Sequence, residues 1–104
     1  MFDIKIINGK IVDGTGKKAF AADLAINGDK IAAIGDLSNE EAKKVIDAKG
    51  KVVSPGFIDF HTHSDYTILF DQRSCSRIYG GVTMLVIGNC GIGLAPIRDE
   101  RKQD

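Results

Sequence analysis

The chain has 104 residues, with 14 basic and 14 acidic side chains and a formal net charge of zero. A chain of this length buries only a modest core, so any enzyme built on a large barrel would be incomplete here. The charge balance excludes a strong field toward nucleic acid, and no apolar run is long enough to span a bilayer. With no signal-peptide pattern and two cysteines, we expect a cytoplasmic protein with reduced thiols, no nucleic-acid partner and no membrane anchor.

Two hairpins are predicted near the start of the chain, each built from short β-branched runs around an Asn-Gly pair. The runs are 4–7 and 11–12 around Asn8-Gly9, and 24–26 and 31–34 around Asn27-Gly28. Asn-Gly favours a type I′ turn, because both central residues of that turn need positive φ. The glycine-rich segment 13–18 is predicted to be the loop joining the hairpins, since it lacks the spacing of a phosphate-binding loop.

The next segment mixes a helix signal with strand signals. Ser38 to Glu41 has the pattern of a capping box, which predicts a single helical turn. Strand character returns at 45–47 and 51–53, and Pro55-Gly56 ends it. We therefore place a domain boundary at about Ser54 to Gly56, between residues 1–54 and residues 55–104.

Beyond this boundary the pattern is strand, helix, strand. The predicted elements are a strand at 57–61, a helix at 73–79 closed by Gly80-Gly81, and an apolar strand at 82–87 buried on both faces. This order predicts a βαβ crossover between parallel strands, and thus an α/β unit after an antiparallel one. The mixed-charge tail at 98–104 is predicted to be a solvated end.

His61 and His63 are the only histidines, and they stand two residues apart after an apolar run. In a strand, residues i and i+2 point to one side, so both imidazoles can reach one metal ion, such as zinc. The alternative is a pair that only decorates a strand end. Asp59 can orient His61, and Asp65 can face a substrate or cap the loop; neither is assigned as the catalytic base.

Cys90 lies in Gly88-Asn89-Cys90-Gly91, directly after the predicted buried strand. A thiolate at the carboxyl end of a barrel strand faces the region where such folds carry out chemistry. The alternative is an inert buried thiol. Cys75 lies on the predicted helix, away from the other candidate site residues, and a role in core or surface packing is enough to explain its presence.

Two strings in the sequence resemble a known family. The string from Val53 to Asp65 resembles the first barrel strand of the amidohydrolase superfamily. The opening Ile-x-Asn-Gly-x-Ile-Val-Asp-Gly-Thr-Gly resembles the N-terminal segment of the same superfamily. The segment from Gly88 to Pro96 resembles the N-acyl-D-amino-acid deacylases, the D-aminoacylase family. The resemblance implies that 1–54 are the N-terminal part of a composite β-sandwich. It also implies that 55–104 begin a truncated TIM-like (β/α)8 barrel with its first two strands.

The resemblance also implies a site and a reaction. His61, His63 and Cys90 would be ligands of one or two divalent ions, zinc in the first place. The substrate would be a small N-acyl-D-amino acid, hydrolysed at its linear amide bond to a carboxylate and a D-amino acid. A cyclic amidase of the dihydroorotase or hydantoinase type is the first alternative, and a non-catalytic β-rich fragment is the second.

The residues that would complete this site are not in the sequence. No histidine follows His63, so the later ligands and the catalytic base are expected beyond the chain end. The missing C-terminal part of the barrel is therefore the expected partner, and the isolated chain is expected to be inactive.

Overall fold

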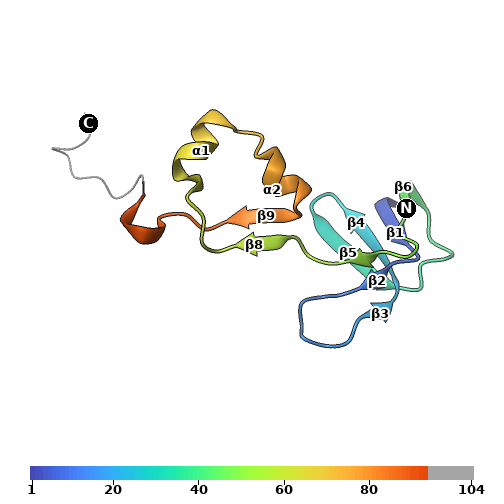
Figure 1. The fold of residues 1–104 in the computed structure, drawn as a ribbon. Coiled ribbons are helices and arrows are strands. Elements are labelled where there is room, and N and C mark those ends of the chain that lie inside the picture. Colours follow the sequence, from blue (N-terminus) through green and yellow to red (C-terminus); the bar gives the residue numbers. More distant parts are fainter. Residues whose placement is uncertain (94–104) are drawn as a thin grey trace. The chain divides into compact units, whose positions relative to one another are not determined.

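A computed structural model describes residues 1–93 of the chain. The chain divides into two compact units, unit 1 (Met1–Pro55) and unit 2 (Gly56–Asp104). Figure 1 shows unit 1 as a β-rich body and unit 2 as a mixture of strands and short helices. A β-rich N-terminal unit followed by an α/β unit is the fold class that the sequence predicts.

Unit 1 consists of seven short strands in two sheets. The strands are β1 (Phe2–Ile7), β2 (Lys10–Ile11), β3 (Phe20–Ala21), β4 (Asp23–Asn27), β5 (Lys30–Gly35), β6 (Ala42–Asp47) and β7 (Val52–Val53). One sheet has the order β5-β4-β1-β6 and the other β3-β2-β7. Both sheets are mixed. β1 pairs antiparallel with β4 and parallel with β6, and β2 pairs antiparallel with β3 and parallel with β7. The core contains the apolar residues Ile11, Leu24, Ala25, Leu37 and Ala48.

The second predicted hairpin is confirmed, with its turn one residue further on. β4 and β5 pair antiparallel, and Asn27 is the last paired residue, opposite Lys30. Gly28 and Asp29 are therefore the central residues, and only Gly28 has positive φ, at 58°. That is the sign pattern of a type II′ turn, which places glycine first, rather than of the expected type I′ turn.

The first predicted hairpin is wrong. β1 pairs with β4 and β6, whereas β2 pairs with β3 and β7, so the strands flanking Asn8-Gly9 belong to different sheets. Asn8 has φ of 60°, but Gly9 is not in the positive region, so the two residues cannot form a type I′ turn. Gly9 is instead needed for close packing: a Cβ there would lie 2.7 Å from Val53 Cγ2. The loop at 13–18 accordingly joins β2 to β3.

The helical turn predicted at Ser38 to Glu41 is also wrong. The side chain of Asp36 accepts a hydrogen bond from the Ser38 amide at 3.0 Å, and the Glu40 amide donates to the Leu37 carbonyl at 3.0 Å, which makes a turn. The buried Lys5 ammonium donates to the carbonyls of Leu37 at 3.1 Å and of Glu40 at 2.6 Å. These long-range bonds fix the two carbonyls in the turn and leave β6 to begin at Ala42.

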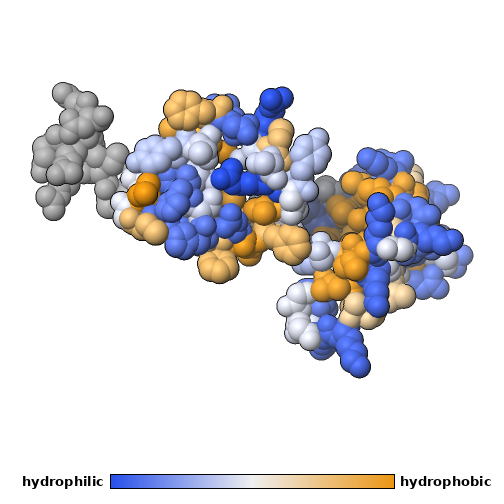
Figure 2. Space-filling model, in the orientation of Figure 1, coloured by the Kyte–Doolittle hydropathy of each residue, from blue (hydrophilic) through white to orange (hydrophobic). Residues whose placement is uncertain are grey.

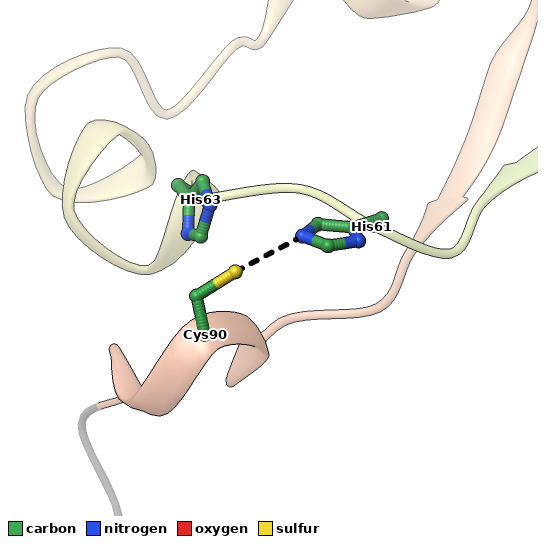
Figure 3. A group of neighbouring side chains, drawn as sticks. All are labelled: His61, His63 and Cys90. Carbon is green, nitrogen blue, oxygen red and sulfur yellow. Dashed lines mark hydrogen bonds between the residues drawn. The ribbon is translucent and has the colours of Figure 1, made fainter.

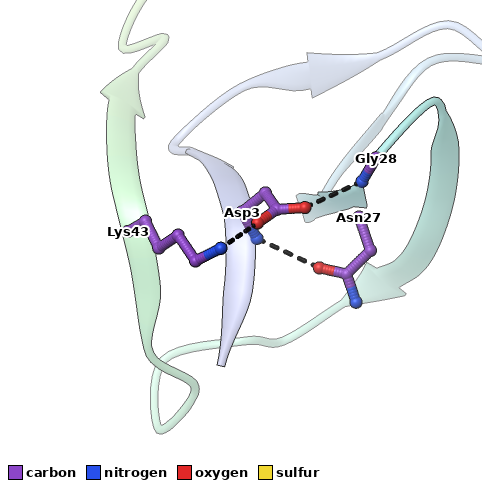
Figure 4. A network of polar contacts seen from close by, with 4 residues as sticks. All are labelled: Asp3, Asn27, Gly28 and Lys43. Atoms are coloured by element: carbon purple, nitrogen blue, oxygen red, sulfur yellow. Dashed lines mark hydrogen bonds and ion pairs between the residues drawn. The ribbon is translucent and has the colours of Figure 1, made fainter.

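Asp3 connects three strands of the larger sheet (Figure 4). Its carboxylate accepts a hydrogen bond from the Gly28 amide at 2.8 Å and pairs with the Lys43 ammonium at 2.6 Å. Its own amide donates to the Asn27 side chain at 3.0 Å. The hydrogen bond from Lys43, with the Gly28 amide second, lowers the pKa of Asp3 below its ordinary value of 3.8. β1 is thus tied by polar contacts both to β6 and to the β4–β5 turn.

Unit 2 contains the predicted strand-helix-strand unit. Its elements are β8 (Phe57–Asp59), α1 (Ser64–Phe70), α2 (Cys75–Tyr79), β9 (Val82–Leu85) and the 3-10 helix η1 (Asn89–Gly91). β8 and β9 pair in parallel, with Asp59 opposite Leu85, which confirms the βαβ crossover. The predicted helix is present as α2, which begins two residues later than expected and ends at Tyr79, with Gly80 as its C-cap; Gly81 takes positive φ at 82°.

Three details of unit 2 differ from the sequence prediction. β8 ends at Asp59, before the histidines, and α1 was not predicted. β9 is not buried on both faces, since Met84 is 56% exposed. Figure 2 shows apolar side chains at the surface of unit 2.

No helix in residues 1–93 is long and apolar enough to cross a membrane. The tail at 98–104 lies outside the described residues.

Candidate metal centre

His61 and His63 lie in the loop between β8 and α1, and not in the strand. β8 ends two residues before His61, and His63 directly precedes the first residue of α1. The alternation of a strand therefore does not explain how they meet. Their rings nevertheless lie edge to face, with centroids 5.7 Å apart and an interplanar angle of 77°. Asp59 stabilises the start of this loop, because its carboxylate accepts a hydrogen bond from the His61 amide at 3.3 Å.

Cys90 reaches the histidines from the other loop at this end of the two strands. It lies in η1, five residues after Leu85, the last paired residue of β9, and its backbone has φ of 58°. Gly88 and Gly91 also have positive φ, at 83° and 72°. A left-handed conformation costs a residue with a side chain roughly 1–2 kcal/mol, and such residues gather at functional sites. The turn directs the Cys90 thiol toward the two imidazoles, 3.4 Å from His61 Nε2 (Figure 3).

The three side chains have the chemistry of zinc ligands, and one pair of them already has the spacing that zinc requires. Their ligand atoms all lie within 4.8 Å of one another, and all three residues are exposed. Ligand atoms bonded to a tetrahedral zinc ion lie about 3.3–3.8 Å apart, given bond lengths of about 2.0–2.3 Å. The 3.4 Å between Cys90 Sγ and His61 Nε2 is already in that range. Imidazole and thiolate ligands also suit zinc, so the donor set fits this ion.

Asp65 differs from these three residues because it is buried. It is 1% exposed, and its Oδ1 accepts a hydrogen bond from the Gly88 amide at 3.0 Å. The bond joins the first turn of α1 to the residue that precedes η1. Asp65 therefore connects the segment that carries the histidines to the loop that carries Cys90.

Three polar residues surround this connection, and the sequence places them beside the candidate ligands: Thr62 and Ser64 flank His63, and Asn89 precedes Cys90. Thr62 and Ser64 are buried and share a hydrogen bond of 2.6 Å between their hydroxyls. The Asn89 amide group donates to the carbonyls of Val86 at 2.9 Å and of Thr62 at 3.4 Å. The sequence indicates these residues by their position, but not the hydrogen bonds that they form. Cys75, by contrast, is a free thiol at the start of α2 and is not in the cluster.

Comparison with known proteins gives a consistent family. The model of the amidohydrolase family matches residues 44–101. The D-aminoacylase of Alcaligenes xylosoxydans xylosoxydans is 48% identical over 96 residues, which are 92% of this chain and 20% of that protein. The chain thus spans about a fifth of the length of the curated relatives it matches.

Solved structures agree with the sequence comparison. A D-aminoacylase structure with a binuclear metal centre matches with a TM-score of 0.88 and 49% identity, covering 93% of this chain and 20% of that one. The N-acyl-D-glutamate deacylase of Bordetella bronchiseptica, in complex with zinc and a phosphonate inhibitor, matches at 0.86 and 43%, covering 91% and 20%. The L-hydantoinase of Arthrobacter aurescens matches at 0.71 and 36%, covering 84% and 20%. The fold and the sequence together show that this chain belongs to the amidohydrolase family.

Proposed function

We propose that the chain supplies His61, His63 and Cys90 to the metal site of an N-acyl-D-amino-acid deacylase. The whole protein would hydrolyse the amide bond of an N-acyl-D-amino acid to a carboxylate and a free D-amino acid. The observation that carries this proposal is the convergence of the three ligand atoms within 4.8 Å, from two separate loops of unit 2.

The residues present define what this part of the site does. His61, His63 and Cys90 would hold one zinc ion or share in holding two. The chemistry that zinc supplies when bound is polarisation of the acyl carbonyl and activation of water as a nucleophile. Asp59 positions the His61 backbone, and the glycines beside Cys90 permit the turn that aims its thiol.

The rest of the site would come from residues beyond this chain. Three ligands from one side leave open positions for later ligands and for substrate. Unit 2 also exposes large apolar side chains, including Phe60 at 77%, Phe70 at 90% and Tyr79 at 92%. Surfaces of this kind mark contact with further protein, so we propose that the remaining strands of a (β/α)8 barrel cover them. The chain alone would then be inactive. A cytoplasmic location is part of the proposal, supported by the free thiols of Cys75 and Cys90.

Deacylase chemistry is favoured over the cyclic amidases. The likeness to the D-aminoacylase structure, at a TM-score of 0.88, exceeds the likeness to L-hydantoinase, at 0.71. A cysteine that faces the two histidines supports the same choice, because Cys90 lies in the segment that resembles the deacylases.

Zinc titration of the purified chain by calorimetry tests the ligand assignment. Wild type is expected to bind zinc, and His61→Ala, His63→Ala and Cys90→Ala should each weaken binding by at least about 10-fold. Cys75→Ala is the matched control, since this thiol is outside the cluster, and its affinity should equal that of wild type. Unchanged affinity in the three ligand variants would refute the assignment.

A chimera tests the activity. In it, residues of this chain replace the matched segment of the Alcaligenes D-aminoacylase, and release of D-amino acid from N-acyl-D-amino acids is measured. We expect hydrolysis that Cys90→Ala abolishes and Cys75→Ala leaves intact. A chimera that folds by circular dichroism and binds zinc, yet releases no D-amino acid, would contradict the proposal.

A further inference from the structure

We infer that Asp65 is a positioning residue that keeps Cys90 facing the two histidines. The inference rests on the proposed function, because it assigns Asp65 a role in building the same metal site. It also decides between the two roles that the sequence leaves open for this side chain, substrate contact and loop support.

The first observation is burial. Asp65 is 1% exposed, whereas His61, His63 and Cys90 are all exposed. A side chain so covered does not reach the open side of the cluster, where a substrate would approach. A buried carboxylate costs folding free energy unless it is hydrogen bonded, so Asp65 needs a specific donor.

The second observation is that partner. Asp65 Oδ1 accepts a hydrogen bond from the Gly88 amide at 3.0 Å, and Gly88 lies two residues before Cys90. Hydrogen bonds to a charged acceptor contribute more than neutral ones. Asp65 itself lies two residues after His63, at the start of α1. The carboxylate therefore ties the two ligand-bearing loops together directly beside the ligands.

The third observation is the conformation that this bond supports. Gly88 and Cys90 both have positive φ, at 83° and 58°. The left-handed Cys90 is unfavourable by itself and persists only where surrounding contacts hold it. The Asn89 amide group adds a second bond between the loops, to the Thr62 carbonyl at 3.4 Å. Without the Gly88 bond, the loop would relax and Cys90 would turn away from the imidazoles.

The two oxygens of Asp65 differ in their contacts, so substitutions can test the hydrogen-bond acceptor separately from the negative charge. Oδ2 is buried and has no hydrogen-bond partner within residues 1–93. Asp65→Asn keeps one carbonyl oxygen for the Gly88 amide, whereas Asp65→Leu keeps a similar volume without any acceptor. The two substitutions thus differ in the one bond on which the inference depends.

Cobalt(II) is the probe, because a cobalt–thiolate bond gives a charge-transfer absorption that reports Cys90 directly. All variants carry Cys75→Ser, so Cys90 is the only thiol. We expect Asp65→Leu to weaken cobalt affinity about 10–100-fold and to reduce the thiolate band, and Asp65→Asn to retain most of both. Asp71→Leu, which changes an exposed carboxylate of the same unit, is the control and should change neither.

Hydrogen exchange of the Gly88 amide in the metal-free chain is the second readout. Exchange should be slow in the parent and in Asp65→Asn, and at least about 10-fold faster in Asp65→Leu. This measurement stands even if no cobalt binds, an outcome that would refute the proposed function alone. Unchanged Gly88 exchange in Asp65→Leu, or an Asp65→Asn variant that loses the thiolate band, would overturn the inference. If Asp65→Leu does not fold, Asp65→Ala replaces it under the same criteria.

Discussion

In unit 1 the most buried side chains are mainly apolar, whereas in unit 2 they are polar. Ile11, Leu24, Ala25, Leu37 and Ala48 form the core of unit 1, accompanied by the ammonium group of Lys5. Within residues 56–93, the side chains at that level of burial are Thr62, Ser64, Asp65 and Ser74. Unit 1 is thus organised by its own hydrophobic core. Unit 2 is organised around polar contacts that hold the candidate metal ligands, while its large apolar side chains remain exposed.

The largest expected effect comes from removing core volume in unit 1. Leu24→Ala should lower the free energy of unfolding of unit 1 by about 2–5 kcal/mol, since Leu24 is buried. Ile31→Ala, at a position 62% exposed on the paired strand β5, is the control and should cost much less. Native-state hydrogen exchange gives the opening free energy of each unit separately. Equal losses in both units after Leu24→Ala would contradict the comparison.

Zinc binding is expected to stabilise unit 2. At a free concentration 100-fold above Kd, a ligand stabilises the state that binds it by about 2.7 kcal/mol. We expect this gain in the exchange of amides in unit 2, with unit 1 unchanged, and no gain in Cys90→Ser. Protection that rises equally in unit 1 would show that the ion binds outside the His61, His63 and Cys90 cluster.

Gly9→Ala should destabilise unit 1 by about 1–3 kcal/mol, because the added Cβ would lie 2.7 Å from Val53 Cγ2. The double variant Gly9→Ala, Val53→Ala removes the clashing methyl group. Its cost should therefore be smaller than the sum of the two single costs. Denaturation of the four proteins in urea measures this coupling, and simple additivity would count against the close packing.

The smallest expected effect is the loss of polar contacts in acid. The pKa values of Asp3, Asp13, Asp36 and Asp47, all in unit 1, lie below the ordinary 3.8. A lowered pKa in the folded state means that the ionised carboxylate stabilises the fold. This stabilisation is complete well above the ordinary pKa of 3.8 and is lost as the pH falls through the lowered value.

Asp3→Asn measures the Asp3 share of that effect. The stability difference between wild type and this variant should be constant above about pH 5 and should disappear in stronger acid. The effect is small because Asp3 and Lys43 are exposed and screened by solvent. The midpoint of urea denaturation against pH gives the difference, and a difference that persists unchanged in acid would refute the Asp3 assignment.

The parts of the fold that the sequence predicted are those set by local signals. The β4–β5 hairpin follows from a short turn with glycine, and the crossover from β8 to β9 follows from a helix between two apolar runs. The pairing of β1 with β6 was missed because parallel partners distant in sequence leave no local trace. The same holds for the bonds from Lys5 that replace the expected helical turn at Ser38.

The candidate site shows the same division. His61, His63 and Cys90 were named from the sequence, because residue type and motif indicate them. The explanation by strand alternation was wrong, since β8 ends before the histidines. The left-handed backbone of Cys90 and the bond from Gly88 to Asp65 depend on two loops meeting in space. No spacing along the chain could have predicted them.

X-ray absorption at the zinc edge, on the chain loaded with one zinc ion, tests the central claim most directly. We expect one sulfur ligand at about 2.3 Å together with nitrogen ligands at about 2.0–2.1 Å. The sulfur contribution should remain in Cys75→Ser and disappear in Cys90→Ser. A zinc shell of nitrogen and oxygen alone in the wild-type chain, or a sulfur that persists in Cys90→Ser, would contradict the account.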